Sequence, residues 1–325
     1  MYLGWTQVAF AEELREDVIP FDVGPRALVA VRHPDGYIVY DGRCPHRGAH
    51  LGHGGRLEGD ALVCPFHGHR VQLGQRERRG HVVQPDSRGL QPDACAAGDG
   101  EPFAVRAYPC LDLPAGLFVL LDERQDTGLG TRLSDLARTH HIHPAFTREI
   151  AVPPEYVIEN VLDADHFAEV HALTRRPELD VREEPGGSLL VDGDLDMARA
   201  NTWQAGAADG GAAAARAHFT AEVFSPTLVV TQLQSGADPY VVITAATPNA
   251  LGGCTARVTV ALPKESSQGR PTVRQLSSLV SGSRTAFEQD ARVWEHLDTS
   301  VIPNYLPGDR LVRIYRDFCE RFQGP

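Results

Sequence analysis

Two short segments in the first quarter of this 325-residue chain each place a cysteine shortly before a histidine. They read Cys44-Pro45-His46-Arg47-Gly48 and Cys64-Pro65-Phe66-His67-Gly68. In both, proline directly follows the cysteine and glycine closely follows the histidine, a composition typical of tight loops. If the four cysteine and histidine side chains act together, the two loops must meet at one end of the fold. This requirement constrains the N-terminal part of the chain more than any other feature.

Two thiolates and two imidazoles can hold a 2Fe-2S cluster in which Cys44 and Cys64 bind one iron and His46 and His67 bind the other. This is the Rieske arrangement, whose reduction potential is higher than that of an all-thiolate cluster. A Cys2His2 zinc site uses the same ligand types. The interleaved order favours the two-iron cluster, because each pair supplies one ligand to each iron. A one-electron carrier in this position implies that the rest of the chain consumes electrons.

The first 125 residues are expected to form an all-β domain around these loops. Short apolar runs such as Ala27–Arg32 and Tyr37–Tyr40 have the length and composition of strands and are separated by the turn residues 33–36. The segment Arg56–Val63 predicts a hairpin that brings the second Cys/His pair to the same tip as the first. The polar residues 74–100 are expected to loop over the surface of this domain.

Residues 126–325 are expected to form an α+β domain with an antiparallel sheet and a long C-terminal helix. Helices are predicted at about 158–173 and 271–296, and residues 205–217 are either a loop or a short helix, with the loop favoured. Alternating apolar patterns indicate strands. These patterns are found at Ser188–Val191, His218–Phe224, Thr227–Gln232, Tyr240–Ala246 and Thr255–Leu262.

The first of these helices carries two histidines, His166 and His171, five positions apart. Two histidines and one carboxylate form the facial triad of mononuclear non-haem iron, which leaves coordination positions open for dioxygen and substrate. Positions i and i+5 lie about 140° apart on a regular helix. If both rings bind one iron, the helix must be widened or broken here. Otherwise the two residues are ordinary surface histidines.

The carboxylate ligand is predicted to be Asp290, on the long C-terminal helix. Apolar residues stand at helical spacing around it: Ala286, Phe287, Val293, Trp294 and Leu297. An aspartate within an apolar stripe requires a cation, because an unpaired buried carboxylate is costly. Glu288 and Asp298 remain as alternatives.

Asp163 precedes His166 by three residues and would share its helix face. Its carboxylate could accept the second ring N–H of an iron-bound histidine and so fix the orientation of the ring. If Asp163 also reached a cluster histidine of a neighbouring subunit, it would become a bridge for electron transfer. Otherwise it is a simple helix-face aspartate.

Taken together, these motifs resemble those of the Rieske non-haem iron oxygenases. The resemblance rests on the two Cys/His loops, on Asn160, on Asp163-x-x-His166-x4-His171, and on the late Asp290 followed by Arg292 and Trp294. The oxygenase component of 3-ketosteroid 9α-hydroxylase is the most similar type, followed by oxygenases like vanillate demethylase. The chain departs from the family pattern at His69, where a bulky aromatic residue is usual.

The resemblance implies an oxygenase component, typically a head-to-tail trimer, that activates O2 at Fe(II) to hydroxylate, oxidatively demethylate or desaturate an apolar, polycyclic or aromatic small molecule. The sequence lacks a Gly-x-Gly-x-x-Gly fingerprint opening a helix, so electrons from NAD(P)H should arrive through a separate reductase or ferredoxin. The alternatives are a Rieske-type electron carrier fused to a small-molecule-binding domain, and a zinc-binding interaction protein.

Charge and hydropathy narrow the class further. The formal net charge of −12 argues against nucleic-acid binding. The chain shows no signal-peptide pattern, and its apolar runs are too short to cross a bilayer, so a cytoplasmic protein is expected. The remaining cysteines show no pairing pattern and are expected to be free thiols. These are Cys95, Cys110, Cys254 and Cys319.

Overall fold

The computed structural model describes residues 1–74, 76–79, 82–85, 103–197, 215–234, 239–265 and 270–324. They form two compact units. One comprises Gln7–Arg124 with Asn249–Leu251, and the other comprises Met1–Thr6, Gln125–Pro248 and Gly252–Pro325. The first six residues therefore pack with the C-terminal unit, whereas the sequence had suggested the N-terminal one. In that unit the Leu3 N–H donates a hydrogen bond to the Phe322 carbonyl oxygen at 2.8 Å.

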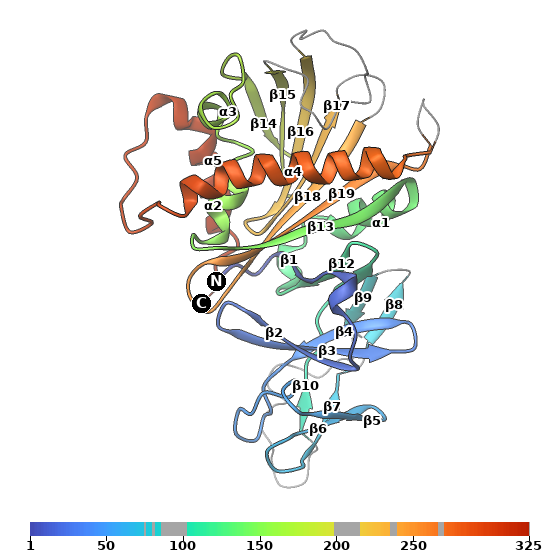
Figure 1. Cartoon of the computed structure of the whole chain (residues 1–325). Coiled ribbons are helices and arrows are strands. Elements are labelled where there is room, and N and C mark those ends of the chain that lie inside the picture. The colour runs from blue at the N-terminus through green and yellow to red at the C-terminus, as the bar shows by residue number, and fades with distance from the viewer. Residues whose placement is uncertain are drawn as a thin grey trace. The chain divides into compact units, whose positions relative to one another are not determined.

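The N-terminal unit is built from small sheets (Figure 1). A three-stranded antiparallel sheet contains β2 (Val18–Val23), β3 (Arg26–His33) and β4 (Gly36–Asp41). A four-stranded sheet has the order β10 (Ala104–Val105), β7 (Arg70–Leu73), β6 (Ala61–Val63) and β5 (Arg56–Glu58). A five-stranded sheet has the order β1 (Trp5–Ala9), β12 (Gly116–Leu120), β11 (Cys110–Leu113), β9 (Val82–Pro85) and β8 (Arg76–Arg79). The first two residues of β1 are grouped with the C-terminal unit. The predicted hairpin over 56–63 corresponds to β5 and β6.

The surface loop predicted for residues 74–100 is wrong over part of its length. Residues Arg76–Arg79 and Val82–Pro85 form β8 and β9, which pair with each other, and β9 also pairs with β11. Sheet pairing with residues distant in the sequence overrides the polar composition that suggested a loop. Residues 86–100 lie outside the part that the structure describes.

The C-terminal unit contains a seven-stranded antiparallel sheet. Its order is β13 (His140–Ile150), β19 (Cys254–Pro263), β18 (Pro239–Pro248), β17 (Leu228–Gln234), β16 (Ala215–Ser225), β15 (Leu189–Met197) and β14 (Leu179–Glu183). The prediction of a loop over 205–217 is wrong for its last three residues. Residues 215–217 belong to β16 and pair with β15. Residues 205–214 lie outside the described part.

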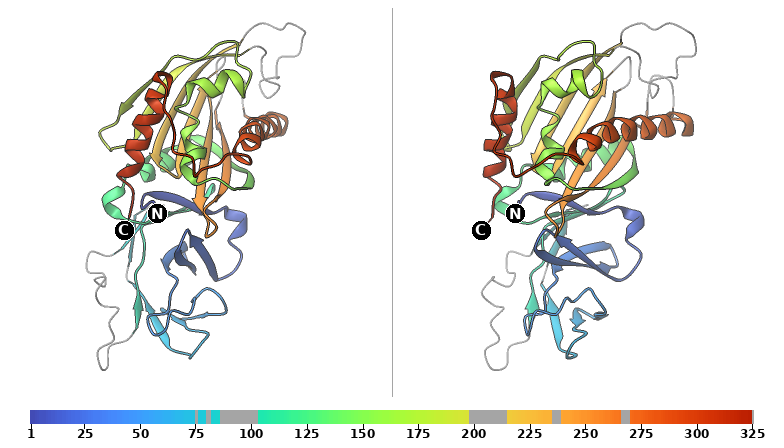
Figure 2. Two further views of the ribbon diagram at one scale, coloured as in Figure 1. Left: turned by 90° about the vertical axis from the view of Figure 1, so that its left-hand side faces the viewer. Right: turned by 60° about the vertical axis from the view of Figure 1, so that its left-hand side comes forward.

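Helices pack around this sheet. The long α4 (Val273–Trp294) lies across β13 and β19 (Figure 1). In the left view of Figure 2, α5 (Arg310–Glu320) and α4 lie on opposite sides of the strands. Two short helices, α2 (Pro154–Glu159) and α3 (Ala164–Glu169), occupy the stretch between β13 and β14. The remaining helix is α1 (Leu129–Thr139), and 3-10 turns cover Ala11–Glu13, Glu123–Gln125 and Pro307–Asp309.

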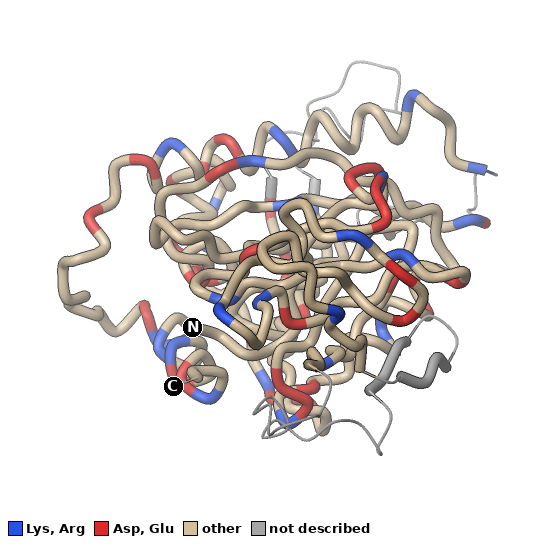
Figure 3. Tube along the Cα trace, turned by 90° about the horizontal axis from the view of Figure 1, so that it is seen from below, with Lys and Arg blue, Asp and Glu red and all other residues tan. Residues whose placement is uncertain are grey.

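This architecture confirms the predicted fold class, an all-β part followed by an α+β part with an antiparallel sheet and a long helix. No helix within the described ranges is long and apolar enough to cross a membrane. Basic and acidic residues are interspersed along the described trace (Figure 3).

Candidate metal centres

The first Cys/His loop, residues 44–48, is closed by main-chain hydrogen bonds. The Gly48 N–H donates to the Cys44 carbonyl oxygen at 2.8 Å, and the Cys44 N–H donates to the Ala49 carbonyl oxygen at 2.8 Å. Gly48 has a φ of 74°, a conformation that residues with a Cβ rarely adopt. The turn therefore holds the cysteine and the histidine on one tight loop.

The second loop, residues 64–68, repeats this pattern. The Gly68 N–H donates to the Cys64 carbonyl oxygen at 3.0 Å, the Cys64 N–H donates to the His69 carbonyl oxygen at 2.9 Å, and Gly68 has a φ of 72°. A Cβ at Gly68 would meet nothing within 4 Å, so the backbone conformation and not a lack of space requires glycine. Two loops of the same construction thus present one cysteine and one histidine each.

The structure brings the four predicted cluster residues together. Cys44 and Cys64 are each 2% exposed, and neither forms a disulfide. Burial raises the pKa of the Cys44 thiol, and a hydrogen bond with Cys64 adds to this effect. The rings of His46 and His67 are exposed, with centroids 4.8 Å apart. A buried pair of thiols and an exposed pair of imidazoles on the same two loops fit the donor set of a Rieske cluster.

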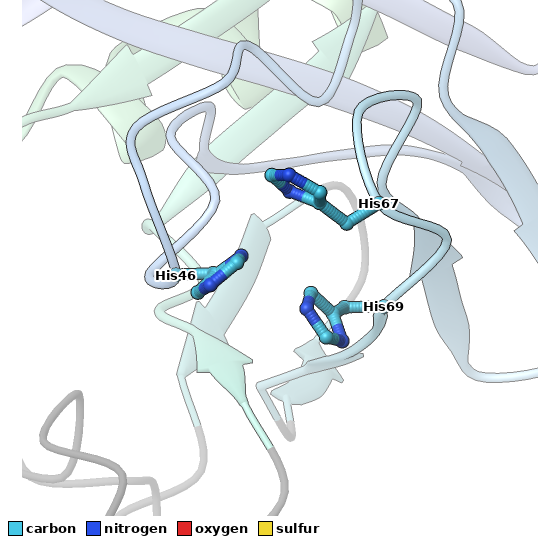
Figure 4. A group of neighbouring side chains, drawn as sticks. All are labelled: His46, His67 and His69. Carbon is cyan, nitrogen blue, oxygen red and sulfur yellow. The ribbon is translucent and has the colours of Figure 1, made fainter.

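A third imidazole, His69, lies beside this pair. Figure 4 shows the rings of His46, His67 and His69 facing a common space. The His69 ring packs edge-on against His46 with a centroid distance of 4.5 Å, and it also contacts Phe103 at 5.3 Å. The residue that departs from the family pattern is therefore in contact with a predicted cluster ligand.

The second candidate centre combines His166 on α3, His171 just beyond α3, and Asp290 on α4. The Asp290 Oδ1 atom lies 3.3 Å from Nε2 of His171 and 4.0 Å from Nε2 of His166. All three side chains are largely buried, with exposed fractions of 11% to 16%. Two imidazole nitrogens and a carboxylate oxygen therefore converge on one point, as a facial triad requires.

The helix is interrupted, and this allows His166 and His171, five residues apart, to face the same point. The continuous helix predicted over 158–173 is replaced by α2 and α3, and α3 ends at Glu169, before His171. The Leu173 N–H donates to the Phe167 carbonyl oxygen at 3.2 Å, and Ala172 has a φ of 53°. A residue in the left-handed conformation commonly ends a helix in this way. It turns the chain so that both rings face the same side.

Asp163 has a different local role from the one the sequence suggested. It is the N-cap of α3, and its carboxylate accepts hydrogen bonds from the main-chain N–H groups of Asp165 and His166. The partner of the His166 ring is the main-chain carbonyl oxygen of Asp163, 2.6 Å from Nδ1. The predicted carboxylate–imidazole contact is therefore wrong, because the carboxylate is used to begin the helix.

Asp290 has an oxygen without a partner. Among the residues that the structure describes, Oδ1 is buried and makes no hydrogen bond. Burial raises the pKa of this carboxyl to about 6, while His171 and a hydrogen bond from Asn160 act in the opposite direction. Burial also lowers the pKa of His166 to about 4. A carboxylate oxygen aimed at two imidazole nitrogens suits a bound divalent metal.

The apolar stripe that pointed to Asp290 is narrower than predicted. Phe287 and Trp294 are buried, but Val293 and Leu297 are 50% and 43% exposed. The alternatives to Asp290 have other partners. Glu288 faces Arg148 at 3.6 Å, and Asp298 accepts hydrogen bonds from Ser300.

Gln289 belongs to the site and was not identified from the sequence. Its Oε1 atom lies 3.0 Å from Nδ1 of His171. The one available signal was its position directly before an aspartate in an apolar stripe, which is a weak signal.

An apolar cavity of about 220 Å³ adjoins the second centre. His166, His171 and Asp290 line part of it. Apolar side chains form most of the remaining wall, including Val157, Phe167, Phe219, Val229, Val242 and Phe287. Besides the three candidate ligands, the residues with polar groups are few: Asn160, Thr231, Tyr240, Thr244, Ser283 and Trp294. A mainly apolar small molecule could therefore lie next to the metal position.

Comparison with known proteins assigns both parts of the chain. Residues 4–88 match the Rieske [2Fe-2S] domain, and residues 130–323 match the 3-ketosteroid 9α-hydroxylase C-terminal domain. A Rieske domain followed by this catalytic domain defines an oxygenase of the Rieske non-haem iron class. The chain belongs to this family, in the branch that has the 3-ketosteroid 9α-hydroxylase type of C-terminal domain, and the family uses a 2Fe-2S cluster and a catalytic Fe(II).

Individual relatives agree with this assignment. The oxygenase component of chloroacetanilide N-alkylformylase from Rhizorhabdus wittichii (strain DC-6 / KACC 16600) is 27% identical over 61% of this chain and 53% of its own length. The chloroplastic pheophorbide a oxygenase of Oryza sativa subsp. japonica is 28% identical over 51% of this chain and 32% of its own length. The chain thus matches about half or less of the length of these curated relatives.

Solved structures share the fold. Dicamba monooxygenase bound to 3,6-dichlorosalicylic acid has a TM-score of 0.70 at 18% identity, covering 99% of this chain and 97% of its own. NdmA of Pseudomonas putida CBB5, as a mutant with caffeine, has a TM-score of 0.66 at 16% identity, covering 98% of this chain and 89% of its own. The match of residues 130–323 to an oxygenase domain disfavours an electron carrier fused to an unrelated binding domain.

Proposed function

We propose that this chain is the oxygenase component of a multicomponent system that oxidises an apolar small molecule with O2. The observation that carries the proposal is the convergence of His166, His171 and Asp290 at the wall of an apolar cavity. Electrons would come from NAD(P)H through a separate reductase or ferredoxin and enter at the exposed rings of His46 and His67. None of the five cysteines in the described part of the chain forms a disulfide, which is compatible with the reducing cytoplasm predicted from the sequence, and Cys95 lies outside the described residues.

We assign the cluster to Cys44, His46, Cys64 and His67, and the mononuclear iron to His166, His171 and Asp290. When bound, the cluster supplies single electrons and the Fe(II) centre supplies the site of O2 activation. The protein contributes the two imidazoles, the carboxylate and the apolar wall that keeps water away from the reacting bond.

We further propose a homotrimer in which Asp163 links the iron of one subunit to the cluster of the next. The support for this proposal comes from the immediate surroundings of Asp163. Asp163 lies at the start of the helix that carries His166, its carbonyl oxygen contacts the ring of that histidine, and its side chain is half-buried. A residue in this position can connect a ligand of the iron to the molecular surface.

The substrate is proposed to be a polycyclic or aromatic small molecule, because the cavity offers ring-sized apolar walls and few hydrogen-bonding groups. Hydroxylation is the favoured reaction. The N-alkylformylase among the relatives makes oxidative dealkylation a second possibility, and desaturation remains a third. All three begin with oxidation of a C–H bond held beside the iron.

A single-turnover experiment tests this proposal. The protein is reduced, mixed with 18O2 and a panel of steroids and methylated aromatic compounds, and the products are analysed by mass spectrometry. We expect oxidation of the cluster together with a product that carries one 18O atom or has lost a methyl group or two hydrogens. If the cluster is oxidised without any oxidised product across the panel, the proposed substrate class is wrong.

A further inference from the structure

We propose that Gln289 is a positioning residue, which holds the His171 ring in the tautomer and orientation in which Nε2 faces the iron. This inference rests on the assignment of His171 and Asp290 as iron ligands.

The two nitrogens of the His171 ring face two consecutive residues of α4. Nδ1 lies 3.0 Å from Oε1 of Gln289, and Nε2 lies 3.3 Å from Oδ1 of Asp290. An amide oxygen can only accept a hydrogen bond, so Nδ1 carries the proton, and in the neutral ring Nε2 then keeps its lone pair. A metal needs this lone pair. Gln289 therefore selects the tautomer of the ring that can bind iron.

The two histidine ligands obtain this support in different ways. The His166 ring faces a main-chain carbonyl oxygen, that of Asp163, which is fixed by the start of α3. His171 lies beyond the end of α3, where the chain reverses at Ala172, and its ring contacts a side chain of another helix. The orientation of His171 thus depends on one replaceable group, whereas that of His166 does not.

Gln289 is well placed to be rigid. It lies within the 22-residue α4, next to Asp290, and α4 is anchored by the buried side chains of Phe287 and Trp294. The carboxylate and the amide that face opposite edges of the ring therefore move as one element. Because the amide is neutral, it orients the ring without adding a second negative charge beside Asp290.

The experiment measures the affinity for mononuclear Fe(II), not turnover. Protein that already carries the 2Fe-2S cluster is titrated anaerobically with Fe(II) in competition with a chelator. The variants are Gln289→Leu, which removes the acceptor, Gln289→Glu, which keeps it, and Arg292→Leu as a matched control on the exposed side of α4. We expect Gln289→Leu to raise the dissociation constant by about 10- to 100-fold. Gln289→Glu should bind iron within a few-fold of wild type or more tightly, and Arg292→Leu should be unchanged.

Wild-type affinity in Gln289→Leu would overturn the proposal. Equal losses in Gln289→Leu and Gln289→Glu would also overturn it, because packing and not the acceptor would then be responsible. If Gln289→Leu does not fold, Gln289→Asn, whose amide is one methylene too short to reach the ring, provides the same comparison. If Asp290→Ala retains the iron, the ligand assignment itself has failed, and this result is distinct from a failure confined to Gln289.

Discussion

The His166 ring nitrogen Nδ1 lies 2.6 Å from the main-chain carbonyl oxygen of Asp163, while the carboxylate of Asp163 caps the helix that carries His166. One residue thus begins the helix and orients an iron ligand. Its side chain caps α3, and its main-chain carbonyl oxygen is the group that contacts the His166 ring. This relationship separates the structural role of Asp163 from the proposed role in electron transfer and allows the two to be tested independently.

Replacing Asp163 by Asn should preserve the fold and both metals but slow electron delivery. Asparagine is as good an N-cap as aspartate, so α3 should begin at the same residue. The negative charge proposed to link the two centres would be lost. We expect rapid-mixing experiments on the reduced protein with O2 and substrate to show slower oxidation of the cluster, by about 100-fold or more if the loss resembles that of an essential polar contact. Asp165→Asn, on an exposed neighbour, is the control. Oxidation at the wild-type rate would refute the bridge.

Asp290→Ala should lose the mononuclear iron and all turnover, while the coloured cluster remains. Removing one of three protein ligands leaves two imidazoles, which hold Fe(II) weakly. Metal analysis and the visible spectrum report the two centres separately. Glu288→Ala, next but one on the same helix and directed at Arg148, should keep the iron. If Glu288→Ala loses the iron and Asp290→Ala keeps it, the wrong carboxylate has been assigned.

Affinity for mononuclear Fe(II) should fall as the pH drops through about 6. Burial raises the pKa of Asp290 to about 6, so below this pH the metal must displace a proton from the carboxyl. We expect at least a tenfold loss per pH unit below that point, because Asp290 alone releases one proton per iron bound. Chelator competition at several pH values measures this. A constant affinity down to pH 5 would contradict the prediction.

The same carboxyl should affect the stability of the metal-free protein in the opposite sense. Its pKa is raised from 3.8 to about 6, so between these values the native state binds more protons than the unfolded state. Stability should therefore decrease as the pH rises through this window, by ~3 kcal/mol at most. The depressed pKa of His166, about 4 against 6.5, acts in the other direction. Comparison with Asp290→Asn by denaturant titration isolates the carboxyl, and the variant should lack this decrease.

Gly68→Ala should weaken the second Cys/His loop. The φ of 72° costs a residue with a Cβ about 1–2 kcal/mol, and no nearby atom opposes the methyl group itself. We expect the loss of cluster absorbance on heating to shift to lower temperature, with the C-terminal centre still able to bind Fe(II). An unchanged temperature would show that the loop can accommodate the residue at no cost.

Much of the site could be predicted because its signals are local. Each Cys/His loop can be recognised from five consecutive residues. Asp290 can be recognised because it is a charged residue among apolar residues at helical spacing. The spacing of His166 and His171 also required a broken helix, and α3 does end before His171. In each case one short segment of the sequence contains all the residues on which the prediction depends.

Other features depend on contacts that sequence periodicity does not contain. Gln289 is identified only once the chain beyond α3 places His171 against α4. The strands β8 and β9 form because β11, distant in the sequence, pairs with β9. The carboxylate of Asp163 faces main-chain N–H groups and not the imidazole, because a helix start competes for it. Contacts between distant segments determine the first two features, and helix capping determines the third.

Counting iron and acid-labile sulfide per chain tests the central claim most directly. After anaerobic reconstitution, the account predicts three irons and two sulfides in the wild type, and two of each in Asp290→Ala. Two irons and two sulfides in both proteins would contradict the account, because the chain would then carry a Rieske cluster without the iron that makes it an oxygenase.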